Sequence, residues 1–258
     1  MEPESFSGAS VLTTTSSVGQ ELREPEGKYA RLTNSQQRKL VGAYDKWARE
    51  TERLLLTARE RGANANQLRT ILAARTPLLE IELRAVANAG TITGAAAGVP
   101  RALRELPSVR GITLALQANN YRLIKDGLIP GILSNLSDKL TAGAALDKVA
   151  LRTAFDGLRH RPASYAGGAW VAIFQTQQAA GRALEKEQGE PQRVLWKLDP
   201  EAQHCQAATD TYGCPELAHE YDSWSQLLTV PAGRVTCRGN CRCELFVWLN
   251  GAWQRGLV

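Results

Sequence analysis

The cysteines of this chain are confined to one short stretch, and their placement is the strongest constraint on its fold. All five lie between residues 205 and 243, whereas the sequence before residue 190 shows helical spacing of apolar residues and no strand signal. We therefore expect a mainly α protein with a multi-helix body over residues 34–189. Residues 190–258 are expected to form a small α+β, cysteine-rich module.

The helical body is expected to begin at the cluster Thr33-Asn34-Ser35, because side-chain oxygens of these residue types cap the first turn of a helix. The first helix would run to about Gly62, and a second from Asn66 to Val86 would be kinked or broken at Pro77. Further helices are expected over residues 112–126, 128–140, 143–160 and 165–187. Residues 1–33, rich in Ser, Thr, Glu and Gly, are expected to form a flexible N-terminal arm.

Residues 85–100 are unusual because Gly90, Gly94 and Gly98 recur at four-residue intervals among Ala, Val and Ile. One interpretation is a Gly-rich loop, or a close helix–helix contact within the body. Another is a mobile apolar segment that lines a pore or touches a membrane. The segment is too short and too weakly apolar to span a bilayer, and no other stretch is long enough, so we expect no membrane-spanning helix.

The last part of the chain changes to short β-favouring runs. Residues 193–198 and Glu244–Leu249 are candidate strands. Asn250-Gly251 is a strong hairpin-turn dipeptide, so residues 252–254 are expected to return as the partner of the second strand.

Charge and the first residues bear on partners and on redox state. The formal net charge of +5 favours contact with DNA or with an acidic protein surface. Residues 1–17 show neither the basic start nor the apolar run of a secretory signal, so we expect synthesis in the cytoplasm, where thiols stay reduced. The cysteines are therefore interpreted first as metal ligands and second as disulfides.

The candidate metal ligands are Cys205, Cys214, Cys237, Cys241 and Cys243. They form two groups, C-x8-C and C-x3-C-x-C, and two ligand groups on separate loops are typical of a structural zinc site. Zinc would also stabilise a module too small to bury a core of its own. Since a tetrahedral site takes four ligands, one of Cys241 and Cys243 is expected to be spare. The alternatives are reduced cysteines without metal, or a disulfide formed after release from the cell.

The order of residues around these cysteines carries a family resemblance. Trp196 and Asp199 precede the first pair, and Cys237 is followed by Asn240-Cys241-Arg242-Cys243. This order resembles the C-terminal signature of the phage Mu F-like minor head proteins, a head-morphogenesis family of tailed phages. In that family a Trp and an acidic residue precede a C-x-x-C pair, and the signature ends in His-Pro-Asn-Cys-Arg-Cys or a cysteine-substituted variant. Here Cys237 stands where the His would be, the first pair is spread to C-x8-C, and the His-Pro is missing.

The resemblance implies a minor head protein near the portal vertex of a phage head, acting in capsid assembly, DNA packaging or delivery. Its partners would be the portal protein, the major capsid protein or both, with DNA as a further contact. It would be oligomeric or present in low copy number within the virion, after synthesis in the host cytoplasm. The rival interpretation is a zinc module that binds nucleic acid through Arg234, Arg238 and Arg242.

A catalytic zinc site is the remaining alternative. It would need a general base, for which Glu216 and Glu220 are close enough in sequence, and His204 or His219 could replace a cysteine ligand. The sequence contains no H-E-x-x-H, nucleophile-elbow or dinucleotide motif. We therefore expect no enzymatic activity.

Overall fold

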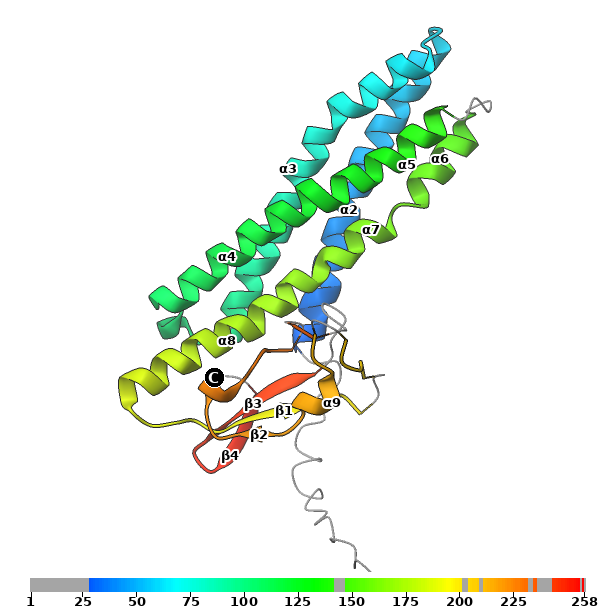
Figure 1. Ribbon diagram of the computed structural model, residues 1–258. Coiled ribbons are helices and arrows are strands. Elements are labelled where there is room, and N and C mark those ends of the chain that lie inside the picture. Colours follow the sequence, from blue (N-terminus) through cyan, green and yellow to red (C-terminus); the bar gives the residue numbers. More distant parts are fainter. Residues whose placement is uncertain are drawn as a thin grey trace, which may run out of the picture.

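The computed structural model describes residues 28–141, 147–200, 204–208, 211–231, 234–235, 243–255 and 257. The protein is mainly helical with one small antiparallel sheet near its C-terminal end, which confirms this part of the fold prediction. In Figure 1 the long helices run alongside one another as an elongated bundle, and the sheet lies across one end of that bundle.

The helices of the body run up and down the long axis of the bundle (Figure 1). Their bounds are α2 Lys28–Glu60, α3 Ala65–Gly98, η1 Arg101–Leu103, α4 Pro107–Leu123, η2 Ile124–Leu128, α5 Ile129–Thr141, α6 Lys148–Asp156, α7 His160–Ala163, η3 Ser164–Ala166 and α8 Gly167–Gln188. Each helix expected from the sequence is present, with most bounds differing by several residues, and α3 runs to Gly98 whereas the sequence predicted an end at Val86. Among the described residues, the first strand begins at Val194, as predicted.

The first helix start differs from its prediction, whereas the second is well capped. Since α2 begins at Lys28, the cluster Thr33-Asn34-Ser35 lies inside the helix and is not its cap. Residues 28–33, predicted to belong to the flexible arm, are therefore helical, and residues 1–27 lie outside the described residues. Strong helix formers upstream of the cluster extend the helix past it. At the start of α3, Asn64 Oδ1 accepts a hydrogen bond from Gln67 N at 3.0 Å, and Gln67 Oε1 accepts one from Asn64 N at 2.8 Å. This reciprocal pair is a capping box.

The Gly-rich stretch is the C-terminal part of α3 and makes a close helix–helix contact, as one interpretation of the sequence proposed. The helix continues through Pro77 without a break. A Cβ added at Gly94 would overlap the carbonyl oxygen of Ala169, and one added at Gly98 would overlap that of Ile173, both in α8. The backbones of α3 and α8 therefore approach more closely than any residue with a side chain permits.

Helices α4 and α5 form one rod joined by the π-helical turn η2. Pro130 lies in the first turn of α5 and has no N–H to donate to the carbonyl four residues earlier, so α-helical pairing cannot continue there. The N–H of Ile129 bonds to the carbonyl of Ile124 instead. The hydroxyl of Tyr165 donates to the carbonyl of Leu123 at 3.4 Å, which holds this turn against the segment that precedes α8.

The C-terminal sheet has four antiparallel strands in the order β2-β1-β3-β4. Their bounds are β1 Val194–Lys197, β2 Glu220–Tyr221, β3 Glu244–Leu249 and β4 Ala252–Arg255. The strands β1, β3 and β4 confirm the three predicted strands. Asn250 and Gly251 form the turn between β3 and β4, with φ values of 52° and 81° that such two-residue turns require. The sequence did not indicate β2, the short helix α9 Cys214–Leu217 or the 3-10 turn η4 Trp224–Gln226.

Two hydrophobic clusters hold the molecule together. One lies within the bundle and includes Tyr44 and Trp47 of α2. The other contains Phe174 of α8, Trp196 of β1 and Trp224 of η4 in one continuous set of buried side chains. Since this second cluster draws on both the helices and the sheet, the apolar side chains of residues 190–258 are buried partly against α8.

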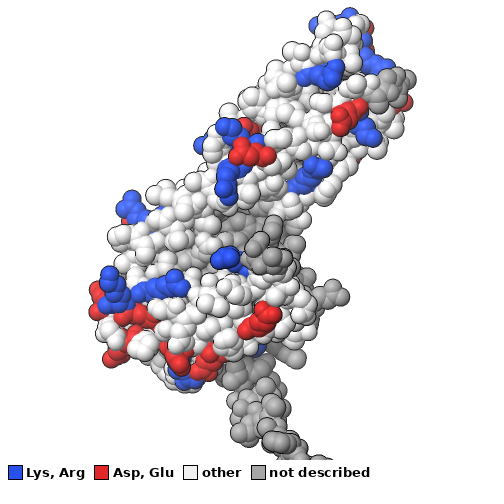
Figure 2. Space-filling model, viewed as in Figure 1, with Lys and Arg blue, Asp and Glu red and all other residues white. Residues whose placement is uncertain are grey.

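The surface in view carries charges of both signs. Figure 2 shows Lys and Arg interspersed with Asp and Glu on this face, with wide uncharged areas between them. In the part of the chain that the structure describes, no helix is long and apolar enough to cross a membrane.

Candidate metal centre

A small hairpin brings the first two cysteines together. Ala208 and Thr211 exchange both backbone hydrogen bonds, at 3.2 and 3.0 Å, in an antiparallel bridge. Next to this bridge the N–H of Cys214 donates to the carbonyl of Cys205 at 3.2 Å. The two sulfur atoms lie 3.3 Å apart, with Cys214 buried and Cys205 partly buried. The fold therefore brings Cys205 and Cys214 into contact despite their wide C-x8-C spacing.

Gly213 allows this closure. A Cβ at this position would lie 2.8 Å from Ala207 N, closer than real Cβ contacts allow, and at a tight 3.2 Å from Cys205 O. The residue is buried in the hairpin, directly before Cys214. A glycine is required here because the two arms of the hairpin approach each other at backbone distance.

The second cysteine group follows a segment that lies beside this hairpin. Tyr212 N donates to Arg234 O at 2.9 Å, and Tyr212 forms a parallel bridge with Val235. Cys243 is 2% exposed, belongs to the same hydrophobic cluster as Cys214, and directly precedes β3. Cys237 and Cys241 lie outside the described residues.

The donor chemistry of the hairpin pair is compatible with zinc. Zinc binds thiolate at about 2.3 Å, so two sulfurs of a tetrahedral site lie about 3.8 Å apart. The observed 3.3 Å between the Cys205 and Cys214 sulfurs is about 0.5 Å shorter than that separation, is a hydrogen-bonding distance for two thiols, and is far above the roughly 2.05 Å of a disulfide bond. Among the described residues, no three Cys, His, Asp or Glu side chains come together as a group that could hold a metal ion.

The charged and imidazole groups around the pair have structural partners. Glu216 Oε2 accepts a hydrogen bond from Gly213 N at 3.3 Å, and Glu220 forms an ion pair with Arg193. The ring of His219 stacks on Tyr221 with centroids 4.2 Å apart. Both glutamates therefore make contacts within the protein, and neither contact is one that a general base would need.

The cysteine region is fixed to the bundle through η4 and α8. Trp224 is fully buried, and a Cβ added at Gly181 of α8 would overlap its ring. Glu185 of α8 accepts a hydrogen bond from Trp224 N at 2.8 Å, and Arg182 donates to Trp224 O at 3.2 Å and to Leu227 O at 3.0 Å. Sequence reasoning missed this docking, although the small residue Gly181 on an otherwise regular helix is the signal that marks it.

Of the three arginines proposed for nucleic-acid contact, Arg234 belongs to the described residues. Arg234 is exposed and its carbonyl accepts the hydrogen bond from Tyr212 N, while Arg238 and Arg242 lie outside the described residues.

The Trp and Asp of the sequence signature lie at and just after β1. Asp199 is half-buried, and Trp196 is 1% exposed in a strand paired with β3. Trp196 is therefore a core residue of the sheet.

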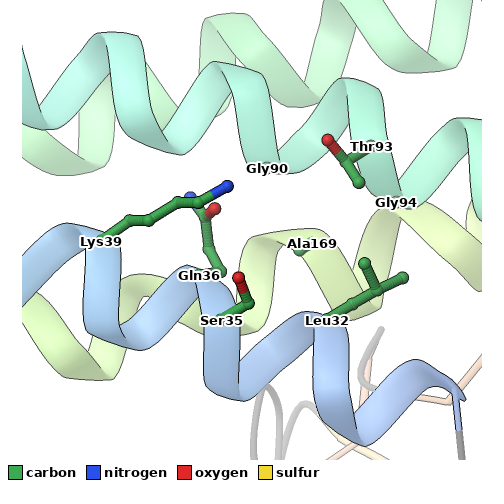
Figure 3. A pocket seen from close by; sticks show the side chains of 8 residues that line it. All are labelled: Leu32, Ser35, Gln36, Lys39, Gly90, Thr93, Gly94 and Ala169. Carbon is green, nitrogen blue, oxygen red and sulfur yellow. The ribbon is translucent and has the colours of Figure 1, made fainter.

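A shallow recess lies between α2, α3 and α8, away from the cysteines (Figure 3). Figure 3 shows Gln36 and Lys39 reaching from α2 toward α3 beside Gly90. The Gln36 side chain fills the space that a Cβ at Gly90 would need, and its Nε2 donates to Val86 O at 2.6 Å. The recess is a by-product of close helix packing and offers no cluster of reactive groups.

In comparisons with protein-family models, with curated proteins and with solved structures, nothing matched this chain.

Proposed function

We propose that this protein is a minor head protein of a tailed phage that acts in head morphogenesis at or near the portal vertex. The proposal starts from the sequence resemblance around Trp196 and the cysteines. The observation that supports it best is the closure of the C-x8-C segment, which brings the Cys205 and Cys214 sulfurs to 3.3 Å. A spacing that departs from the family signature thus still yields the close cysteine pair that the signature implies.

In this proposal the module holds a structural zinc and acts as a rigid docking element. Thiolates of Cys205 and Cys214 would supply two ligands, and the remaining two would come from Cys237, Cys241 and Cys243. The zinc would fix the loops and carry out no chemistry, since Glu216 and Glu220 are engaged in structural contacts. The helical body would contact the portal or the inner wall of the capsid.

The test is to measure the protein in phage particles. Full heads and empty precursor heads are purified from cells that carry the gene, and the protein is quantified by mass spectrometry beside the lysate. Enrichment in heads at a few copies per particle would support a minor head protein, and a lower amount in full heads would assign it to assembly. Absence from both kinds of head would overturn the proposal.

The docking element has its own test in the same particles. Cys214→Ser should reduce incorporation into heads, because the loop would lose its metal and its shape. If this variant folds and is incorporated normally, the module is not the docking element.

A further inference from the structure

The outer line of α2 carries a run of basic side chains that the proposed function does not use. Arg31, Arg38, Arg49 and Arg53 are exposed, and with Gly42 they follow spacings of seven, four, seven and four residues. Such spacings place residues on one side of a helix. Over these 22 steps the line is about 33 Å long at 1.5 Å per residue.

This line is opposite the buried side of the helix. The buried positions Leu40, Tyr44 and Trp47 pack into the bundle cluster, which leaves the basic line facing outward. A Cβ added at Gly42 would meet nothing within 4 Å, so the middle of the line is open to a flat or rod-like partner.

Two acidic residues near the line are already neutralised. Asp45 accepts both hydrogen bonds of the Arg159 guanidinium at 2.8 and 2.6 Å, and Glu50 pairs with Arg75 at 2.6 Å. Their negative charges are therefore balanced by basic residues from other helices, and they subtract little from the charge of the line.

Three of the four arginines of the line are outside the ion pairs of the described residues. Within the described part of the chain, Arg38, Arg49 and Arg53 form no ion pair. Glu52 lies on the flank of the line and is half-buried. The line is therefore predominantly basic, unlike the mixed charges of the face in Figure 2.

We propose that the outer line of α2 binds the phosphate backbone of double-stranded DNA without sequence preference. Arginine guanidinium groups match phosphate oxygens in geometry and charge. A protein partner would require an apolar centre in the interface, and the line carries no apolar side chain between Arg31 and Arg53. Single strands are bound by aromatic rings that stack on bases, and the line has none.

This inference is independent of the phage-head proposal, and it concerns a surface far in sequence from Arg234, Arg238 and Arg242. It is tested on the full chain by fluorescence anisotropy with a labelled DNA duplex of about 30 base pairs, long enough to cover the line, at roughly 50 to 200 mM NaCl. The test variant combines Arg38→Gln, Arg49→Gln and Arg53→Gln. The matched control removes the same number of exposed charges elsewhere in the body, at Arg101→Gln, Lys139→Gln and Lys148→Gln.

We expect the wild type and the control to bind with a steep salt dependence, and the test variant to bind at least about tenfold more weakly at roughly 100 mM NaCl. The slope of log K against log salt is negative, and its magnitude should decrease by about 0.9 for each phosphate that the variant no longer neutralises. Equal weakening in the control would show an effect of net charge alone and overturn the proposal, as would unchanged binding by the test variant.

Two further probes separate the kinds of partner. Tighter binding to a labelled single strand of thymidines would overturn the assignment to duplex DNA. Binding of labelled polyglutamate as tightly as the duplex, with the same weakening in the test variant, would overturn it in favour of an acidic protein. Circular dichroism of both triple variants establishes that they keep the helical fold.

Discussion

At the scale of single residues, a few side chains make contacts that their position in the sequence does not predict. Tyr44 is fully buried in α2, and its hydroxyl donates to Phe155 O at 2.8 Å across the bundle. Burial raises the pKa of Tyr44 well above its ordinary value, and the carboxylates of Asp45 and Asp156 add to this while Arg159 opposes it. Cys205 and Cys214 likewise lie side by side, with sulfurs 3.3 Å apart, although eight residues separate them in the sequence.

Tyr44→Phe tests the buried hydroxyl and its titration. At pH 7 the variant should lose about 1 kcal/mol of unfolding free energy, because the Phe155 carbonyl loses its donor. The raised pKa means that the folded state keeps the phenol proton, so this contribution is complete below about pH 10, decreases above it as the unfolded chain ionises, and is gone once the pH passes the folded-state pKa. Urea unfolding at about pH 7, 9 and 10.5 should therefore show the wild type losing its advantage. A difference that stays constant with pH would contradict this.

The cysteine pair predicts bound zinc. Full-length protein purified without chelator should contain about one zinc per chain by elemental mass spectrometry, and Cys205→Ser or Cys214→Ser should lose most of it. His219→Gln is the control and should keep its zinc, since the ring of His219 stacks on Tyr221. Zinc-free wild-type protein with normal stability would leave the cysteines as reduced packing residues.

At the scale of elements, small residues decide how the helices meet. Gly94 and Gly98 let α3 lie against the backbone of α8, and Gly181 lets the Trp224 ring lie against α8 from the other side. The helix α8 is therefore packed closely on both the bundle and the cysteine module. Its position depends on the absence of side chains at these glycines.

Gly94→Ala tests this contact against a matched substitution. The added Cβ would overlap Ala169 O, a backbone atom that cannot move alone, so the unfolding free energy should fall by about 2 to 3 kcal/mol. Gly42→Ala is the control, because its Cβ would meet nothing and alanine favours helix by up to about 1 kcal/mol. Thermal unfolding followed by circular dichroism compares the two. Equal stability of both variants would show that α3 and α8 can separate without cost.

At the scale of the whole molecule, the sheet and the bundle share one buried cluster. Phe174, Trp196 and Trp224 belong to it together, and hydrogen bonds from Arg182 and to Glu185 join η4 to α8. The chain should accordingly unfold as one unit, since the cluster that buries the apolar side chains of the sheet also contains side chains of α8.

Trp224→Ala tests this coupling. We expect a loss of about 3 to 5 kcal/mol, with helix content and tryptophan fluorescence still changing in a single transition. Trp248→Ala is the control, because that ring is 37% exposed near the β3–β4 turn, and it should cost about 1 kcal/mol. A first fluorescence transition that leaves the helices intact would show that the module unfolds separately.

Local patterns in the sequence were enough to predict much of the architecture. Apolar residues at helical spacing determined the helices of the body, and the β-favouring runs with Asn250-Gly251 determined β1, β3 and β4. These features depend on residues close together in the chain, whose spacing and conformational preferences act locally. The capping cluster at Thr33 failed because neighbouring helix formers outweighed it.

Tertiary structure alone decided what the small and reactive residues do. The sequence left the Gly-rich stretch open between loop, contact and mobile segment, and the packing of α8 made it a helix contact. The sequence likewise did not reveal that Gly213 and the Ala208–Thr211 bridge would place Cys205 beside Cys214, or that Trp224 would pack against Gly181. Each of these outcomes depends on a close contact, at a glycine, between two segments of the chain. The local periodicity of the sequence contains no information about which segments come into contact.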